Sequence, residues 1–574
     1  RVVIEELNFG LPALWEPPKD PEAEAAKESV SQGPTDIKRI VGVVQRAARE
    51  AQIPEPRKPW LPVLADSYDY SKLPSKRTDD ELVLGVTDDA RQQAQPTVSY
   101  FPDRDGNVAI IGTGGSGKST ALRTIAVASA VTVRGGPVHV YGLDFAGGGL
   151  QMLESLPHVG SIVAGDDEER VARLLRWLRD LVDQRAVRYS EARAGDIVEY
   201  RRIAKQPQEP RVLLLLDGMG AFREAYETSA SSAFFSVFSQ IATDGRQVGV
   251  HVIVTGDRAG AIPPSLSSSI QRRVVLRMAS GDDYSTLNVA GDILNSASPP
   301  GRGILDELET QIAVLGGDAN VAVQAREIDK LAAAMTKAGV EPAPSIERLK
   351  DLVPLGELPI EIEGRPVIGL ADDNLGPIAT EVTGPFLIAG PPGSGRTTAL
   401  ATIASALRRS KSSTELVLIS PRRSSLAALP LWNRSADDPD AVQGLVSALL
   451  AEVTAPKAKP GSVALFIENI TDFVDSDIEL ELESLLKAAI KLEHFVVAEA
   501  ETSSWSGAYS FGKPMKSGRR GLILQPDDGD EDLLKASFGR IRRGTYPPGR
   551  GFLVGGGRSR KIQLAITDEE PAPG

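Results

Sequence analysis

Two stretches of this sequence have the spacing of a phosphate-binding loop, and they lie 278 residues apart (Gly112 to Gly390). The first, Gly112-Thr-Gly-Gly-Ser-Gly-Lys-Ser119, fits the pattern G-x-x-x-x-G-K-[ST] throughout. The second keeps the glycines, but Arg396 stands where the pattern has lysine. Such a loop joins a buried strand to the N-terminus of a helix, so both copies constrain their surroundings to an α/β arrangement.

Segments that flank the two loops match one another in the same order along the chain. The upstream run 84–89 matches 368–373, and the downstream run ending in Asp217 matches the run ending in Glu468. We also align His251 with His494. Matches in one order indicate a tandem duplication.

The pentapeptide Pro-Pro-Gly-Arg-Gly closes each copy, starting at Pro299 and at Pro547. We therefore expect two domains of one fold: residues 36–326 with an intact loop, and residues 327–574 with a degenerate loop. Residues 1–35 are expected to be the tail of an upstream domain and its linker. The Pro-rich segments 53–62 and 341–354 are predicted connectors.

Short runs rich in Val, Ile and Leu alternate with amphipathic helical stretches such as 169–185 in both copies. This alternation is typical of buried parallel strands covered by helices. We predict an α/β fold: two tandem P-loop domains whose parallel sheets are flanked by helices. The predicted strands are 107–111, 138–143, 212–216 and 250–254, then 386–389, 415–419, 463–467 and 495–498.

Composition excludes several kinds of site. The chain has no cysteine and four scattered histidines, which excludes a disulfide framework and makes transition-metal chemistry unexpected. No run reaches the roughly 18 apolar residues of a membrane span, so we expect a soluble chain. A net charge of −13 argues against a chain that mainly grips nucleic-acid phosphates.

The first loop predicts binding of ATP with Mg²⁺. Its backbone N–H groups would face phosphate oxygens, Lys118 would reach the outer phosphates, and Ser119 would ligate Mg²⁺ together with Asp217 at the end of a buried strand. The candidate nucleotide-binding residues are Gly112, Thr113, Gly114, Gly115, Ser116, Gly117, Lys118, Ser119 and Thr120.

Hydrolysis needs a group that orients the attacking water, and many ATPases place a glutamate directly after the metal-site aspartate. Gly218 stands there in this chain. We therefore predict slow turnover with the catalytic residue unknown, and Asp257 and Asp244 as candidate substitutes.

The second loop departs from the pattern in both halves. A guanidinium is longer than an ammonium and binds oxygens as a planar fork, and Glu468 followed by Asn469 replaces the aspartate. Two interpretations stay open: nucleotide binding without efficient hydrolysis, or a structural remnant. The candidate binding residues are Gly390, Pro391, Pro392, Gly393, Ser394, Gly395, Arg396, Thr397 and Thr398.

Further motifs give the chain a family resemblance. Lys58-Pro-Trp-Leu-Pro-Val-Leu64, Leu143-Asp-Phe-Ala-Gly-Gly148, Gly245-Arg-Gln-Val-Gly-Val-His251 and the paired Pro-Pro-Gly-Arg-Gly resemble FtsK/SpoIIIE-type ATPases. More closely, the tandem arrangement is similar to the second and third ATPase domains of the EccC family of type VII (ESX) secretion. The resemblance covers nearly the whole chain. One departure is Thr255-Gly-Asp257, where DNA-pumping members carry alanine-threonine-glutamine.

The resemblance implies several partners. They are an upstream ATPase domain, membrane secretion components, neighbouring subunits in a ring, and a WXG-class substrate that presents a C-terminal helical signal, all on the cytoplasmic side of the cell membrane. We expect residues from about 356 to 570 to carry the groove for that signal, against the alternative that this copy only packs on its neighbour. Candidate arginine fingers are Arg246, Arg258, Arg272 and Arg273.

Two other functions compete with secretion. A DNA translocase or conjugation coupling ATPase would need a basic channel and a DNA-reading module, and neither is evident after Gly551. A binding scaffold without catalysis would use the same fold, and sequence does not separate it from a secretion ATPase with weak hydrolysis. We expect no nucleic-acid partner.

Overall fold

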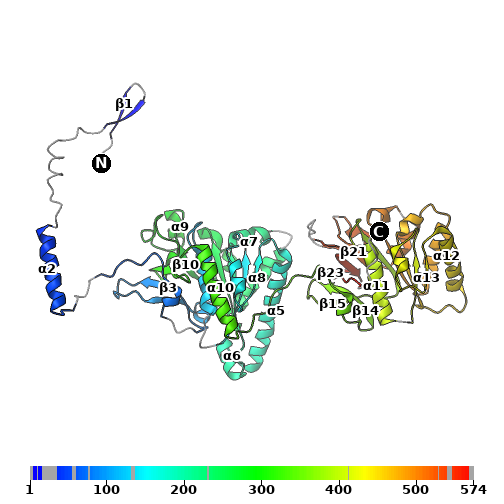
Figure 1. Ribbon diagram of the computed structural model, residues 1–574, viewed down its shortest axis with the longest axis horizontal. Helices are drawn as coiled ribbons and strands as arrows, with labels where there is room; N and C mark the ends of the chain where they lie inside the picture. Colours follow the sequence, from blue (N-terminus) through cyan, green and yellow to red (C-terminus); the bar gives the residue numbers. More distant parts are fainter. Residues whose placement is uncertain are drawn as a thin grey trace. The chain divides into compact units, whose positions relative to one another are not determined.

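The computed structural model describes residues 4–8, 11–15, 35–54, 60–74, 78–130, 136–228, 232–411, 413–507, 509–527, 529–538 and 546–567 (Figure 1). The chain forms two compact units, one of residues 1–63 and 88–95 and the other of residues 64–87 and 96–574. Of the predicted upstream tail, only a hairpin and Thr35 lie among the described residues.

The described residues of the smaller unit form one hairpin and one helix. Strands β1 (Ile4–Asn8) and β2 (Leu11–Trp15) pair antiparallel. Helix α2 (Asp36–Glu50) begins after Thr35, whose hydroxyl accepts a hydrogen bond from the Lys38 N–H, as an N-cap residue does. No residue of α2 is buried, although Ile37, Ile40, Val41 and Val44 form an apolar stripe at helical spacing.

The larger unit contains two mixed sheets. The first has the strand order β4-β3-β12-β11-β10-β5-β9-β8-β6-β7, in which β10 through β7 run parallel and β11 and β12 form an antiparallel hairpin. Its strands are β3 (Leu82–Asp88), β4 (Thr97–Tyr100), β5 (Val108–Ile111), β6 (Val138–Asp144), β7 (Val159–Ala164), β8 (Arg211–Asp217), β9 (Val250–Gly256), β10 (Arg272–Leu276), β11 (Arg302–Leu305) and β12 (Leu308–Ile312).

The second sheet repeats this plan with the order β13-β14-β23-β22-β21-β16-β20-β19-β17-β18, and β15 pairs with β14. Its parallel part runs from β21 to β18. Its strands are β13 (Glu361–Ile362), β14 (Arg365–Ala371), β15 (Pro377–Ala379), β16 (Gly384–Gly390), β17 (Glu415–Ile419), β18 (Arg434–Ala436), β19 (Val463–Ile467), β20 (Phe495–Glu501), β21 (Gly521–Leu524), β22 (Arg550–Gly555) and β23 (Arg558–Leu564).

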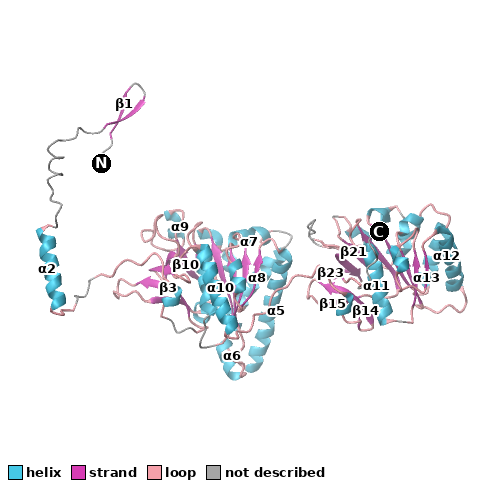
Figure 2. Cartoon of the chain, in the orientation of Figure 1, coloured by secondary structure: helices cyan, strands magenta, loops and turns pink. Residues whose placement is uncertain are grey.

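Helices cover both faces of each sheet (Figure 2). In the buried strand β8, Leu214 packs with one core cluster and its neighbours Leu213 and Leu215 pack with the other, so the strand is apolar on both faces. The helices are α3 (Pro102–Asp105), α4 (Lys118–Ala130), α5 (Glu168–Ala192), α6 (Ile197–Ile203), α7 (Met219–Tyr226), α8 (Ser232–Asp244), α9 (Gly281–Thr286), α10 (Val321–Lys337), α11 (Arg396–Ser410), α12 (Pro439–Thr454), α13 (Glu479–Lys491), α14 (Tyr509–Lys516) and α15 (Glu531–Leu534).

The predicted α/β fold is confirmed, and each predicted strand lies within a strand of the parallel part, except that the prediction 107–111 starts one residue before β5. The antiparallel strands at one side of each sheet were not predicted, so the sheets are mixed rather than purely parallel. None of the described helices is both long enough and apolar enough to cross a membrane.

One alignment between the copies was wrong by one residue. Strand β8 pairs Leu213 with His251, and the corresponding strand β19 pairs Ala464 with Phe495. Phe495 therefore takes the place of His251, and the aligned His494 precedes strand β20.

Candidate functional site

The first loop lies at the carboxyl edge of the first sheet, between β5 and α4. Lys118 is the first residue of α4, and its Nζ donates hydrogen bonds to the carbonyl oxygens of Gly112 (2.6 Å) and Thr113 (2.9 Å). Burial lowers the pKa of Lys118, while the carboxylates of Asp217 and Asp257 oppose this shift. The ammonium is thus held at the loop, facing two carboxylates.

The two predicted metal ligands meet in the structure. The Ser119 hydroxyl donates to Asp217 Oδ2 at 2.6 Å, and the Asp217 side chain is fully buried. On its other side, Asp217 Oδ1 accepts from the Thr255 hydroxyl at 2.5 Å, and Thr255 Oγ1 accepts from the Gly218 N–H at 2.8 Å. Thr255 is thus a positioning residue for Asp217, a role that the sequence did not reveal.

A hydroxyl and a carboxylate side by side fit Mg²⁺, which prefers oxygen ligands and keeps waters and nucleotide phosphates for its other positions. Among the described residues, no group of three or more His, Cys, Asp or Glu side chains could hold a metal ion by itself. The residues present therefore suit a metal that arrives with a nucleotide.

The pentapeptide Pro-Pro-Gly-Arg-Gly braces the loop in each copy. Gly301 N donates to the Ser116 carbonyl at 2.8 Å, and Gly549 N donates to the Ser394 carbonyl at 2.9 Å. The approach is close: a Cβ on Gly117, which has φ +102°, would lie 2.5 Å from Gly301 N. This contact explains why both copies carry glycine at these positions.

In each copy, the arginine of the Pro-Pro-Gly-Arg-Gly pentapeptide donates hydrogen bonds to the segment that precedes the first strand of the sheet. Arg302 Nη2 donates to the carbonyl oxygen of Leu64 at 2.9 Å, and Arg550 Nη2 donates to that of Leu349 at 2.8 Å. Both arginines are buried. In each copy, the segment just before the first strand, the pentapeptide and the loop are therefore linked by hydrogen bonds.

A cavity of about 350 Å³ opens beside Thr120, at the start of α4. Its walls come from the brace, the β12 strand and the segment before the domain. The lining residues are Asp66, Ser67, Thr120, Pro299, Pro300, Gly301, Gln311, Ile312, Val314, Gly317, Asp318 and Ala319.

The structure separates the two candidate catalytic carboxylates. Asp257 directly follows β9 and is exposed at the same edge as the loop. Asp244 ends α8, before β9, and pairs with Arg179 at 2.6 Å. Because β9 runs parallel to β5, Asp244 lies at the opposite edge of the sheet and is not available to a nucleotide at the loop.

A glutamate at position 218 would be strained. Gly218 has φ +92°, a conformation that side chains disfavour. A Cβ there would also lie 3.1 Å from the backbone carbon of Phe145. The local backbone therefore explains why residue 218 carries no carboxylate.

The four candidate arginine fingers divide between the two edges of the sheet. Arg246 precedes β9, and Arg272 and Arg273 begin β10, so all three lie at the edge opposite the loop. Arg272 is also paired with Asp105. Arg258 is exposed just after β9, at the edge of the loop, and a role of any of the four in a neighbouring subunit stays a prediction.

The second loop has the same backbone setting but different side-chain partners. Arg396 Nη1 lies 3.1 Å from Glu499 Oε2, and Glu499 is 1% exposed. Glu499 Oε1 accepts from the Asn469 N–H at 2.7 Å, just as Thr255 accepts from the Gly218 N–H. Glu499 therefore takes the place of Thr255.

The strand registers agree with this correspondence. The residue before the first loop, Ile111, pairs with Gly256, and the residue before the second loop, Ala389, pairs with Ala500. The sequence analysis missed Glu499 because the alignment was shifted by one residue. Burial raises the pKa of Glu499, while Arg396 and the Asn469 N–H oppose the shift.

The carboxylate that replaces Asp217 also has a different hydrogen-bond partner. Glu468 is nearly buried, and its Oε2 accepts from the hydroxyl of Ser420, which follows β17, at 2.9 Å. The second copy thus differs from the first at the cation, at the strand-end acid and at the residue that supports that acid.

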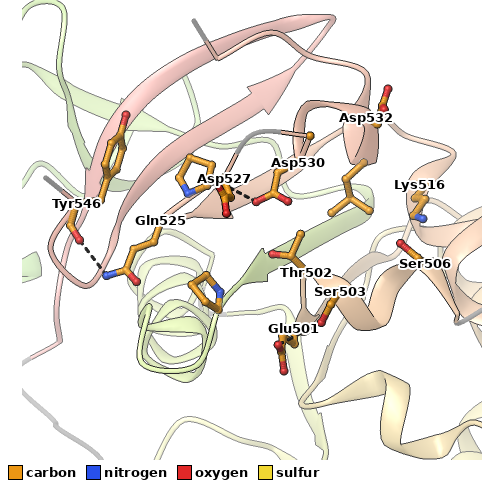
Figure 3. Close-up of a pocket in the computed structure, with 14 residues that line it drawn as sticks. Glu501, Thr502, Ser503, Ser506, Lys516, Gln525, Asp527, Asp530, Asp532 and Tyr546 are labelled. Atoms are coloured by element: carbon orange, nitrogen blue, oxygen red, sulfur yellow. Dashed lines mark hydrogen bonds between the residues drawn. The ribbon is translucent and has the colours of Figure 1, made fainter. Parts of the chain in front are cut away.

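A larger cavity, of about 750 Å³, opens beside Pro391 of the second loop (Figure 3). It lies where β20 and β21 end, the edge at which α/β folds bind ligands. Its charged lining is mostly acidic: Glu501, Asp527, Asp530 and Asp532, against Lys516.

Comparison with known proteins agrees with this geometry. Residues 73–294 match the FtsK/SpoIIIE family. The ESX secretion system protein YukB of Bacillus subtilis is 23% identical over 93% of this chain, and the ESX-4 secretion system protein EccC4 of Mycobacterium tuberculosis is 27% identical over 84%. The chain is a relative of the type VII secretion ATPases.

A solved structure shows the same fold as this relative of the secretion ATPases. Thermomonospora curvata EccC (ATPases 2 and 3), in complex with a signal sequence peptide, is 22% identical with a TM-score of 0.67, over 89% of this chain and 97% of that one. The chain spans 37% of YukB and 40% of EccC4.

Proposed function

We propose that this chain is the ATP-binding, cytoplasmic part of a type VII secretion ATPase, and that it recognises and helps to export WXG-class substrates. One observation carries the proposal: Lys118, Ser119 and Asp217 are assembled at one loop. ATP binds there with Mg²⁺ near Ser119 and Asp217. The base and ribose occupy the cavity beside Thr120, which is concave, preformed and adjacent to the loop.

Hydrolysis by the purified chain should be slow, well below the roughly 1 to 10³ per second of typical enzymes. The reason is the absence of a carboxylate at Gly218 and the altered partners of Arg396. Mass spectrometry of nucleotide released from the purified chain, read beside a steady-state turnover assay, measures occupancy and catalysis together. Turnover within the typical range that depends on Asp257 would contradict this prediction.

An upstream ATPase domain is the partner we propose for α2. The repeat aligns Ile37 with Ile328 and Val41 with Ala332. In α10, Ile328 and Ala332 are buried against the first copy, whereas Ile37 is 74% exposed. An apolar helix face of this kind is suited to packing on a further copy of the same fold.

We propose that the substrate signal docks at the β18–α12 edge of the second copy. The corresponding edge of the first copy is covered by residues 341–349 of the chain itself. Tyr141 donates through its hydroxyl to the Pro344 carbonyl, and Ile346 N donates to Ser161 Oγ, both at 2.8 Å. This edge therefore suits an added segment of polypeptide.

The second copy offers more room at that edge. The N-cap residues Asp167 and Asp438 correspond, so Ala441 and Gly444 of α12 replace the arginines at positions 170 and 173 of α5. Those arginines hold the covering segment by its carbonyls. Ala441 and Gly444 are exposed, and a Cβ on Gly444 would contact nothing within 4 Å.

Gly444→Glu should weaken binding of a substrate signal by at least about tenfold, because its side chain would fill the edge and, unlike the arginines of the first copy, could not donate to the carbonyls of an added segment. The residue is inside a helix, where replacing glycine favours folding, so the loss would not report unfolding. A labelled C-terminal peptide of a cognate WXG-class substrate is titrated against the full chain. The matched control is Gly281→Glu, at an exposed helical glycine with open space in the first copy. Equal affinity for both variants would contradict the proposed edge.

A DNA translocase is the second candidate function, and the charge balance disfavours it. A chain with a net charge of −13 has no excess of Lys and Arg side chains to replace the counterions of a DNA duplex. We therefore propose no nucleic-acid partner. Ring assembly with neighbouring subunits stays a proposal, with Arg258 as its candidate trans-acting group.

A further inference from the structure

We propose that Glu499 controls the admission of nucleotide phosphate to the second loop. While its carboxylate is paired with Arg396, the cation that would meet the phosphate is already occupied. A nucleotide can bind only after this pair is separated. The second loop is then a latent nucleotide site closed by an internal anion, which goes beyond the ATP site proposed for the first copy.

The backbone of the second loop does not close it. Gly393 and Gly395 keep the left-handed conformations of Gly115 and Gly117 in the first loop, with φ of +79° and +95°. The brace from Gly549 is also present. The N–H groups that cradle phosphates can therefore take the same arrangement in both copies.

The difference between the copies lies in the side chains and in how they pair. At the first loop, Lys118 faces Asp217, and the supporting residue Thr255 is neutral. At the second loop, Arg396 faces Glu499, with Glu468 close enough to affect the ionisation of Glu499. Each site has two buried carboxylates, Asp144 and Asp217 in the first and Glu468 and Glu499 in the second. Only in the second site does one of them form an ion pair with the cation of the loop, and a triphosphate would have to displace that carboxylate.

The pair is well placed to persist. Glu499 is almost fully buried and is fixed by the Asn469 N–H, so it cannot leave the pair by turning into solvent without losing that hydrogen bond. Arg396 is the more exposed partner, with 16% of its side chain accessible. The acidic cavity beside Pro391 adds further negative charge near the mouth of the loop.

The test removes the carboxylate and measures binding at the second loop alone. Lys118→Ala silences the first loop, and Glu499→Thr is added to give the second loop the residue of the first. A fluorescent ATP analogue is titrated with Mg²⁺, and a photoreactive analogue followed by peptide mapping locates the label. We expect Glu499→Thr to raise the affinity at least about tenfold over Lys118→Ala alone, with label in residues 390–398.

A second variant separates this effect from an altered fold. Glu499→Gln keeps the shape and removes the charge, so it should also raise the affinity, whereas Glu501→Gln, on the same strand but outside the pair, should raise it less. If neither Glu499 variant gains affinity while both remain folded by circular dichroism, the proposal is overturned. Label at 112–120 in the Lys118→Ala chain would instead contradict the predicted role of Lys118, because it would show that the substitution does not silence the first loop.

Discussion

Lys118→Ala should weaken ATP binding at the first loop by about 30- to 150-fold, which is about 2–3 kcal/mol for a lost charge-assisted hydrogen bond. Lys118 is the only cation of the loop sequence, and its Nζ is held at the carbonyls of Gly112 and Thr113, directly beside the phosphate position. Alanine continues helix α4, so the fold should be retained. Isothermal titration of ATP with Mg²⁺ measures the change.

Ser119→Ala is the matched control, because it removes the metal ligand and leaves the phosphate cation in place. We expect this variant to bind ATP equally well with and without Mg²⁺, whereas the unmodified chain should bind more weakly when a chelator removes the metal. The Lys118→Ala chain should be weak in both conditions. Full nucleotide stoichiometry in Lys118→Ala at low nucleotide concentration would remove the first loop from the proposed site.

Much of the fold could be predicted because the buried strands are continuous apolar runs. The run before Asp217 packs apolar side chains on both faces of the sheet, which is the pattern of a buried parallel strand. The strand nevertheless begins one residue earlier, at Arg211, which is buried by partners far away in the sequence. The antiparallel strands were missed because they pair across distant segments of the sequence, as β14 does with β23.

In the candidate site too, the residues that were predicted are those with a local sequence signal, and those that were missed depend on how distant strands pair. Lys118, Ser119 and Asp217 were predicted, because a loop motif and a strand-end acid are local signals. Glu499 was not, since its role depends on which residue of β20 faces the loop, and a one-residue shift hides that. The same holds for the candidate arginine fingers: a sequence shows that an arginine borders a strand, but the edge of the sheet at which it lies depends on the strand direction.

Stability of the first copy depends on a charged cluster at the edge opposite the nucleotide loop. Arg211 is fully buried and donates to both carboxylate oxygens of Asp103, and its Nε lies 3.4 Å from Asp79 Oδ2. Burial lowers the pKa of the adjacent His251 to about 4, so this histidine is neutral near pH 7. Arg211 is therefore the cation that balances Asp103.

Arg211→Met should destabilise the first copy by about 2–3 kcal/mol, because it removes the charge-assisted hydrogen bonds to the half-buried Asp103, whereas Asp79 keeps Arg201 as its partner. Hydrogen exchange of the β8 and β9 amides measures the loss locally, and the amides of β19 and β20 in the second copy serve as an internal reference. Arg246→Met is the matched control: Arg246 is exposed and donates to the Asp103 and Arg104 carbonyls, so its loss should change stability by only about 0.5 kcal/mol. Equal protection of β8 in the two variants would show that the buried charge at Arg211 is compensated by groups other than those named.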